Sequence, residues 1–258
     1  MDEPIAVVLA AGKGTRMKSD LPKVLVEICG RPMVEYVLDA LAAAGIHRVL
    51  LVVGYRSDLV CERLGAAKRA AGLIPAVTFV EQTEQLGTGH AVMVCREHLA
   101  RHKGPVLVVT GDSPLIQPSS VRKLLARFAD QRPACILGTA HKDDPGGLGR
   151  IVRDSAGNFV KIVEVKDATE AERRITECNM STYVFDGQAL MTALAELRNN
   201  NAQREYYITD CCGILRDRGH KVLAVAELEP CEALSINNLD ELAEVEAVIR
   251  SLSAHSQP

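Results

Sequence analysis

IAVVLAAGKGTRMKSDLPKVL, residues 5–25, decides the fold, because an apolar run of strand length leads directly into a glycine-rich, basic loop. Loops of this kind at the carboxyl end of a strand commonly bind phosphates through backbone N–H groups. Gly12 and Gly14 have no Cβ, so both can adopt positive φ and let the backbone approach a ligand closely. Arg16 and Lys23 add positive charge. The stretch therefore predicts a strand followed by an anion-binding loop.

This loop matches neither of two well-known nucleotide-binding motifs. It lacks the P-loop pattern Gly-x-x-x-x-Gly-Lys-Ser/Thr. Met17 occupies the position where a dinucleotide fingerprint has its third glycine, which disfavours NAD binding. A glycine-rich surface turn without a ligand is the alternative interpretation, and the added Arg16 and Lys23 argue for an anion site.

The rest of the chain alternates between apolar runs of strand length and segments of helical periodicity. Strands are expected at 48–54, 76–80, 105–110 and 134–140, and helices at 33–44, 58–71, 91–99 and 121–129. This alternation predicts an α/β fold with a Rossmann-like, doubly wound and mostly parallel sheet. Residues 151–165 read as two strands around a turn at 155–158, which predicts a small antiparallel lobe beside the sheet.

One continuous domain is expected over residues 1–250, because neither a repeat nor a linker interrupts this pattern. A final amphipathic helix is expected after Asn238, which with Glu241 forms a predicted capping pair. Residues 251–258 are expected to be a disordered tail.

Composition excludes several classes of protein. The net charge of −3 argues against non-specific nucleic-acid binding, which needs a basic face. No run approaches the roughly 20 apolar residues of a membrane span, and residues 1–4 do not resemble a signal peptide. We therefore expect a cytoplasmic protein that binds neither nucleic acid nor a membrane, and leave its oligomeric state open. The eight cysteines are scattered without a C-x-x-C pair, so we expect neither zinc nor disulfides.

A carboxylate follows a second buried strand. In PVLVVTGDSPLI, residues 105–116, the apolar run ends at Thr110, and Gly111 and Asp112 come next. Ligands bind at the carboxyl edge of open α/β sheets, and Mg²⁺ takes only one or two protein carboxylates beside substrate phosphates. Asp112 is therefore a candidate Mg²⁺ ligand, with a turn cap ahead of Ser113 as the alternative role.

The segment QTEQLGTGH, residues 82–90, again places glycines between a strand and a helix. The carboxamide of Gln82 offers a donor and an acceptor, which can match the N3–H and O4 of uracil. A solvated loop glutamine is the alternative, Thr88 could be an N-cap of the next helix, and His90 has no evident role.

In this order, the segments resemble the uridyltransferase half of the bacterial GlmU-type N-acetylglucosamine-1-phosphate uridyltransferases. The segments that carry the resemblance are LAAGKGTRMKSDLPKVL, EQLGTGHA, GDSPLI, GLGRIVRD, IVEVKDAT, NNNAQREYYITD and INN, and it covers nearly the whole chain. The resemblance implies the fold of nucleotide-diphospho-sugar transferases with an antiparallel sugar-binding lobe. It also implies that UTP and N-acetylglucosamine 1-phosphate react, with Mg²⁺ as cofactor, to give UDP-N-acetylglucosamine and pyrophosphate.

The resemblance further implies roles for individual residues. Those implied to bind the nucleotide are Leu9, Ala10, Ala11, Gly12, Gly14, Lys23, Gln82, Gly87, Thr88 and Gly111. Those implied to surround the sugar phosphate are Gly149, Glu164, Asn179, Thr209 and Asn237. The implied catalytic residues are Arg16, Lys23 and Asp112. The implied Mg²⁺ ligands are Asp112 and Asn237.

The absence of an evident catalytic histidine or cysteine agrees with this chemistry. A phosphate monoester has a second pKa near ~6, so its attacking oxygen is an anion at neutral pH and needs no general base. The site must instead hold two polyanions in line, through positioning worth about 7–11 kcal/mol and through positive charge.

The sequence also departs from the family pattern. Met180 and Ser181 follow Asn179 where the family usually has Thr-Gly or Ala-Gly, and Thr110 and Leu148 replace frequent tyrosines. These changes leave the nucleotidyl chemistry untouched and weaken the assignment of the sugar. Two alternatives stay open: a pyrophosphorylase for another sugar 1-phosphate that uses UTP or dTTP, and a non-catalytic nucleotide-sugar sensor.

The bifunctional enzymes continue into a left-handed β-helix of hexapeptide repeats that performs acetyl transfer. These 258 residues contain no such repeats, and no acetyl-CoA-dependent activity is expected of them. Whether the chain is a natural single-domain protein or a fragment stays open.

Overall fold

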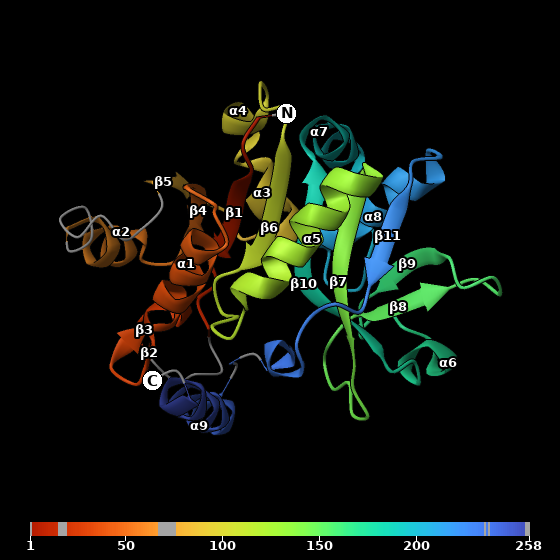
Figure 1. Cartoon of the computed structure of the whole chain (residues 1–258). Helices are drawn as coiled ribbons and strands as arrows, with labels where there is room; N and C mark the ends of the chain where they lie inside the picture. The colour runs from red at the N-terminus through yellow and green to blue at the C-terminus, as the bar shows by residue number, and fades with distance from the viewer. Residues whose placement is uncertain (1, 15–19, 67–75, 235, 237, 256–258) are drawn as a thin grey trace.

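A mostly parallel sheet forms the centre of the computed structural model, which describes residues 2–14, 20–66, 76–234, 236 and 238–255. Its main strands are β1 (Ile5–Ala10), β4 (Arg48–Val53), β5 (Ala76–Glu81), β6 (Pro105–Thr110), β7 (Cys135–His141), β10 (Glu177–Asp186) and β11 (Val222–Val225). They lie in the order β11-β7-β10-β6-β1-β4-β5 (Figure 1). Of these strands, β10 runs antiparallel to both its neighbours, and the remaining pairs are parallel.

The interior strand β1 pairs with β4 on one side and with β6 on the other. Its side chains alternate between two hydrophobic cores, with Ala6 and Val8 in one and Ile5 and Val7 in the other. Burial on both faces explains why this strand is a continuous apolar run. The predicted α/β fold with a doubly wound sheet is confirmed.

Helices cover both faces of the sheet (Figure 1). The core that contains Ala6 and Val8 is covered by α1 (Met33–Ala43), α2 (Ser57–Ala66) and α5 (Pro118–Gln131). The opposite core is covered by α3 (Thr88–Met93), α4 (Arg96–Leu99), α7 (Gly187–Glu196) and α8 (Ile208–Asp217). The single helix predicted at 91–99 is wrong. The N–H of Cys95 bonds to the carbonyl of Val92 at 3.1 Å, and this tighter turn separates α3 from α4.

A small antiparallel lobe is attached to β10. It consists of β8 (Arg150–Arg153) and β9 (Phe159–Val163), which pair antiparallel, and of the short helix α6 (Glu170–Arg173). The hairpin predicted at 151–165 is therefore confirmed. The strand β10, to which the lobe is attached, was not predicted from the sequence.

The C-terminal helix α9 (Leu239–His255) contacts a second, two-stranded sheet of β2 (Glu27–Ile28) and β3 (Arg31–Pro32). The predicted capping pair is confirmed, since Glu241 N donates to Asn238 Oδ1 at 2.9 Å and Asn238 Nδ2 donates to Glu241 Oε1 at 2.9 Å. Within the described ranges, none of the helices combines the length and the apolar character that crossing a bilayer requires.

The expected disordered tail at 251–258 is wrong for residues 251–255, which continue α9. Earlier turns of this helix are anchored in a small hydrophobic cluster that contains Ile28 and Met33. Val245 is a fully buried member of the cluster, and Val248 and Ile249 pack against it while partly buried. Residues 256–258 lie outside the described residues.

Candidate functional site

A cleft of about 280 Å³ opens at the carboxyl edge of the sheet, where β1 lies between β4 and β6. Ligands of open α/β sheets bind in crevices outside the carboxyl ends of the strands. The predicted nucleotide residues that line the cleft are Leu9, Ala10, Ala11, Gly12, Lys23, Gln82, Gly87 and Thr88. The cleft is also lined by Asp112, so the structure brings the loop after β1 and the carboxylate after β6 together.

An ion pair joins Lys23 Nζ to Asp112 Oδ2 inside this cleft, where their side chains are 13% and 26% exposed. Gly14 has a φ of +67°, and a Cβ there would lie 2.6 Å from the Cβ of Lys23. A glycine at this position therefore leaves the space that the lysine side chain occupies. Gly12 does not adopt the left-handed conformation, and Arg16 lies outside the described residues.

Asp112 does not cap the following turn. Within the described part of the chain, its carboxylate accepts no backbone hydrogen bond, and the hydroxyls of Thr110 and Ser113 bond to each other at 2.7 Å instead. The N–H of Gly111 donates to Leu9 O at 2.8 Å and so joins the ends of β6 and β1. These contacts leave the Asp112 carboxylate directed at Lys23.

Gln82 is buried at the base of the cleft, with 4% of its surface exposed. Its Nε2 lies 3.1 Å from Gly87 O and 3.0 Å from His90 Nδ1. A carbonyl oxygen can only accept, so the NH₂ group must point at Gly87, and its second hydrogen points at the histidine. The contact gives His90 a role that the sequence did not show, because it holds the orientation of the amide.

The amide oxygen of Gln82 accepts no hydrogen bond from the described residues, and it is the group left to contact a base. An acceptor matches the N3–H of uracil or thymine and repels the unprotonated N3 of cytosine. The donors of Gln82 are engaged within the protein, so only its oxygen has no partner among the described residues, and the contact of Gln82 with uracil stays a prediction.

Residues 86–89 are held against the turn at Tyr206. Gly89 N donates to Tyr206 O at 2.7 Å, and Tyr206 N donates to Leu86 O at 2.8 Å. Gly87 has a φ of +103°, and a Cβ there would lie 2.6 Å from Tyr206 O, so the position requires glycine. Thr88 is the first residue of α3 and does not cap it; its hydroxyl accepts from Ile208 N at 3.1 Å.

Four of the predicted sugar residues meet beneath the antiparallel lobe. Asn179 N donates to Gly149 O at 2.9 Å, and Thr209 Oγ1 donates to Glu164 Oε1 at 3.3 Å. Asn179 Nδ2 also donates to the hydroxyl of Tyr183 at 2.7 Å, an orienting contact that no sequence signal indicated. Asn237, the fifth predicted residue, lies outside the described residues.

Burial raises the pKa of the Glu164 carboxyl, although the hydrogen bond from Thr209 acts in the opposite direction. The folded state therefore binds more protons than the unfolded chain above the ordinary pKa of 4.5, and the free energy of unfolding falls as pH rises through this range.

Glu164→Gln should unfold at a higher temperature than the wild type at pH 7, because it removes a buried negative charge. Melting curves at pH 7 and below pH 4 test this. The two proteins should converge at the lower pH, where Glu164 is protonated, and an equal difference at both pH values would contradict the explanation.

A second cavity, of about 510 Å³, adjoins the first and shares Thr110 and Asp112 with it. Its lining includes the departures from the family pattern, Leu148, Met180 and Ser181. Ser181 has a φ of +51° and lies in an irregularity of β10. The described linings of the two cavities do not include the four predicted sugar residues.

The donor set at Asp112 fits a magnesium ion. The described residues contain no group of three or more histidine, cysteine or acidic side chains that could hold a metal. A single carboxylate between two cavities suits Mg²⁺, which keeps several waters and takes further oxygens from substrate phosphates. In this structure the ammonium group of Lys23 supplies the positive charge beside that carboxylate.

The cysteines carry no chemistry in this site. The described thiols are free, and Cys95, Cys135, Cys178, Cys211 and Cys212 are buried. Burial raises the pKa of the Cys95 thiol to about 12, so it is protonated at neutral pH.

Gln85 also lines the first cleft, and its Nε2 donates to Ala11 O at 3.0 Å. No sequence signal indicated this residue.

Comparisons with known proteins agree with this geometry. Residues 6–210 match the family described as the MobA-like NTP transferase domain. The bifunctional protein GlmU of Brevibacillus brevis is 44% identical over 245 residues, which are 95% of this chain and 51% of that protein. The bifunctional protein GlmU of Pelotomaculum thermopropionicum is 45% identical, with 95% and 52% covered. The chain thus spans about half the length of the curated relatives it matches.

Solved structures share the fold at low sequence identity. A putative glucose-1-phosphate thymidylyltransferase from Bacillus anthracis superposes with a TM-score of 0.78 at 19% identity, with 96% of each chain covered. A UDP-glucose pyrophosphorylase in complex with UDP-glucose gives a TM-score of 0.76 at 17% identity, with 97% of this chain and 99% of that chain covered.

Proposed function

Because the chain belongs to the MobA-like NTP transferase domain family, we propose that it forms UDP-N-acetylglucosamine and pyrophosphate from UTP and N-acetylglucosamine 1-phosphate. The observation that carries the proposal is the cleft in which the Lys23–Asp112 ion pair and the free amide oxygen of Gln82 face one ligand space. The similarity to half of the bifunctional GlmU proteins supports this choice of substrates.

The nucleotide half of the reaction uses the parallel sheet. Gln82 accepts from the N3–H of the base, and the backbone at Gly12 lies against the triphosphate. Lys23 leaves Asp112 for the phosphate oxygens and stabilises the charge that develops on them as pyrophosphate departs. Arg16 is proposed to share this role. The lysine is therefore a group whose partner changes when the nucleotide enters.

The acceptor half uses the antiparallel lobe. Gly149, Glu164, Asn179 and Thr209 are proposed to hold the sugar, so that its phosphate oxygen attacks the α-phosphorus in line. That oxygen is already ionised at neutral pH, which agrees with a site that offers no general base. Mg²⁺, when bound, supplies positive charge to the phosphates, and Asp112 with Asn237 would hold it.

The test is a substrate panel read by pyrophosphate release. UTP, dTTP and CTP are each combined with N-acetylglucosamine 1-phosphate, glucose 1-phosphate and other sugar 1-phosphates in the presence of Mg²⁺. The proposal expects the highest kcat/KM for UTP with N-acetylglucosamine 1-phosphate. Binding of UDP-sugars without turnover would refute it in favour of a nucleotide-sugar sensor.

One observation favours a second candidate, a pyrophosphorylase for a different sugar 1-phosphate. Leu148, Met180 and Ser181 line the cavity that adjoins Asp112, and each differs from the usual residue of the GlmU pattern. These side chains alter the volume and polarity next to the acceptor. Preference for another sugar in the same panel, with UTP retained, would select this candidate. The cytoplasmic location stays a prediction.

Gln82→Leu should raise the KM for UTP about tenfold, the worth of one hydrogen bond to the base, while kcat changes little. The KM for CTP should rise less, so the ratio of kcat/KM for UTP to that for CTP should fall. Steady-state kinetics with both nucleotides measure this. An unchanged preference would mean that Gln82 does not contact the base.

A further inference from the structure

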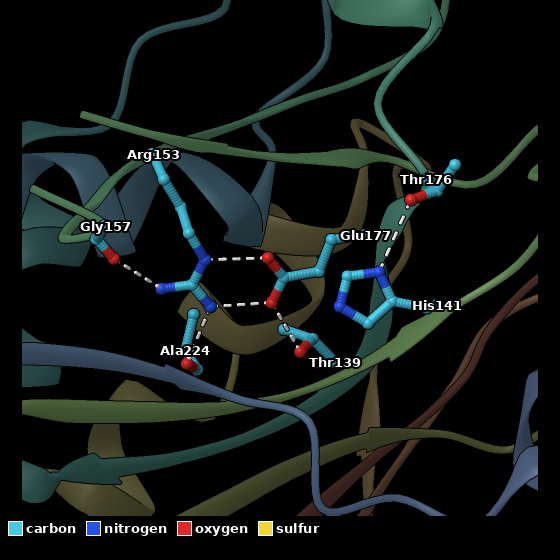
Figure 2. A network of polar contacts seen from close by, with 7 residues as sticks. All are labelled: Thr139, His141, Arg153, Gly157, Thr176, Glu177 and Ala224. Atoms are coloured by element: carbon cyan, nitrogen blue, oxygen red, sulfur yellow. Dashed lines mark hydrogen bonds and ion pairs between the residues drawn. The ribbon is translucent and has the colours of Figure 1, made fainter. Parts of the chain in front are cut away.

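Four strands are joined at one polar network around the carboxylate of Glu177 (Figure 2). Arg153 donates from Nε to Oε2 at 2.7 Å and from Nη2 to Oε1 at 2.6 Å, and Thr139 Oγ1 donates to Oε1 at 2.7 Å. The guanidinium group also donates to the carbonyl oxygens of Ala224 at 2.9 Å and Gly157 at 3.1 Å. The network ties β8 to β7, β10 and β11.

The lobe packs into the core below it through Ile151, Phe159 and Ile162, but its strands have little backbone pairing with the main sheet. In the described sheet, β8 pairs with β10 at the register position Cys178↔Arg150, and β9 pairs with β8 alone. Three residues along β8 from that position, Arg153 reaches back to Glu177 on β10. The side-chain contact therefore adds a directional tie between the lobe and β10, beside the non-directional packing of the core.

The ion pair is well shielded from water, with the Glu177 side chain 9% exposed and that of Arg153 30% exposed. Burial by itself would raise the pKa of the Glu177 carboxyl, but the hydrogen bonds from Arg153 and Thr139 outweigh it and lower the pKa. The carboxylate is thus charged at neutral pH, and both of its oxygens are bonded.

The network lies next to the sugar half of the candidate site. Glu177 precedes Asn179 by two positions on β10, so the two side chains lie on the same face of the strand. Asn179 pairs in register with Thr139, a member of the network, and its N–H donates to Gly149 O. Gly149 in turn precedes β8. A shift of the lobe would therefore separate Gly149 from Asn179.

We propose that the Arg153–Glu177 pair positions the antiparallel lobe for the sugar 1-phosphate, and this rests on the proposed function. Both are positioning residues that act through Gly149 and Asn179. The nucleotide half, built on the parallel strands, does not depend on them. Loss of the ion pair should therefore weaken binding of the sugar 1-phosphate without weakening binding of UTP.

The experiment compares Arg153→Leu with the double variant Arg153→Leu/Glu177→Leu. The single variant leaves a buried carboxylate unpaired and should lower Tm by roughly 10 °C. The double variant removes both charges and should recover much of this loss, since an apolar pair can replace a buried ion pair. In both, the KM for the sugar 1-phosphate should rise about 10- to 100-fold while the KM for UTP stays within about twofold, because small misplacements of a binding group have effects of this size.

Two further variants serve as controls. Arg153→Lys keeps the charge without the bidentate fork and should give an intermediate KM. Arg63→Leu removes an ion pair with Glu27 in which both side chains are more than half exposed, and should leave both KM values unchanged. A double variant whose sugar KM returns to the wild-type value together with Tm would overturn the proposal, as would equal changes in both KM values.

Hydrogen exchange separates this inference from the proposed function. In the substrate-free double variant, amides at 146–149 and 178–181 should exchange at least about tenfold faster, with amides of β1 and β4 unchanged. If the wild type releases no pyrophosphate, the proposed function fails and this exchange pattern decides the positioning role alone. Unchanged amide exchange in the lobe would refute the positioning role of the ion pair.

Discussion

Asp112→Asn is expected to reduce pyrophosphate release from UTP by about 10³-fold while Tm stays within a few degrees of the wild type. The substitution keeps the shape of the side chain and removes its negative charge. Asp112 is the one described carboxylate that lines both cavities, and it pairs with Lys23. Without that charge, Asp112 would no longer form an ion pair with Lys23 and would be a weaker ligand for Mg²⁺.

The matched control is Asp39→Asn, which removes a carboxylate that is 43% exposed, pairs with Arg31 at 2.6 Å and lines neither cavity in the described part of the chain. It should leave turnover unchanged, because exposed pairs contribute little. Continuous pyrophosphate assays and thermal melts measure both variants. Turnover by Asp112→Asn within tenfold of the wild type would remove the metal and catalytic roles of this residue.

Lys23→Ala is expected to lower kcat/KM for UTP by about 10²- to 10³-fold, the usual size of losing one group that stabilises developing charge. Its ammonium group lies in the cleft beside Asp112, and η2 (Lys23–Leu25) anchors the segment through the buried Val24 and Leu25. The fold should survive, since these two side chains are untouched. Lys123→Ala is the control and should leave turnover unchanged, because Lys123 forms an exposed ion pair with Glu229 and lines neither cavity among the described residues.

The same variant makes a prediction of opposite sign for metal binding. Removing the ammonium group takes a competing positive charge away from Asp112, so Mn²⁺ should bind the nucleotide-free protein more tightly than it binds the wild type. Electron paramagnetic resonance titration with Mn²⁺ measures this without turnover. Equal or weaker binding by Lys23→Ala would mean that the lysine does not occupy the place of the cation.

Local signals predicted which strand ends meet at the cleft. β1 and β6 are apolar on both faces, which only a strand between two helical layers explains, and the chemistry-bearing residues follow each strand directly. Parallel strands end at one edge of the sheet, so the position of Asp112 near Lys23 could be derived from the order of elements. Of the two glycines expected to be able to adopt positive φ, Gly14 does and Gly12 does not, and the positive φ of Gly87 was not predicted.

The remaining features depend on contacts between distant segments. Thr88 was a candidate N-cap from the sequence, but in the fold its hydroxyl accepts a hydrogen bond from Ile208 N at the start of α8. The orientation of Gln82 depends on His90 and Gly87, and that of Asn179 on Tyr183. Such hydrogen bonds have no periodic signature in a sequence, because either partner could equally have been solvated.

The sequence by itself determined the doubly wound sheet and the family, because strand burial and the order of motifs are local properties of the chain. The tertiary structure alone decided that Lys23 pairs with Asp112, that Gln82 presents only its oxygen, and that Arg153 binds Glu177. Each of these depends on which polar group finds a partner once water is excluded, and a buried group without a partner is too costly to remain so.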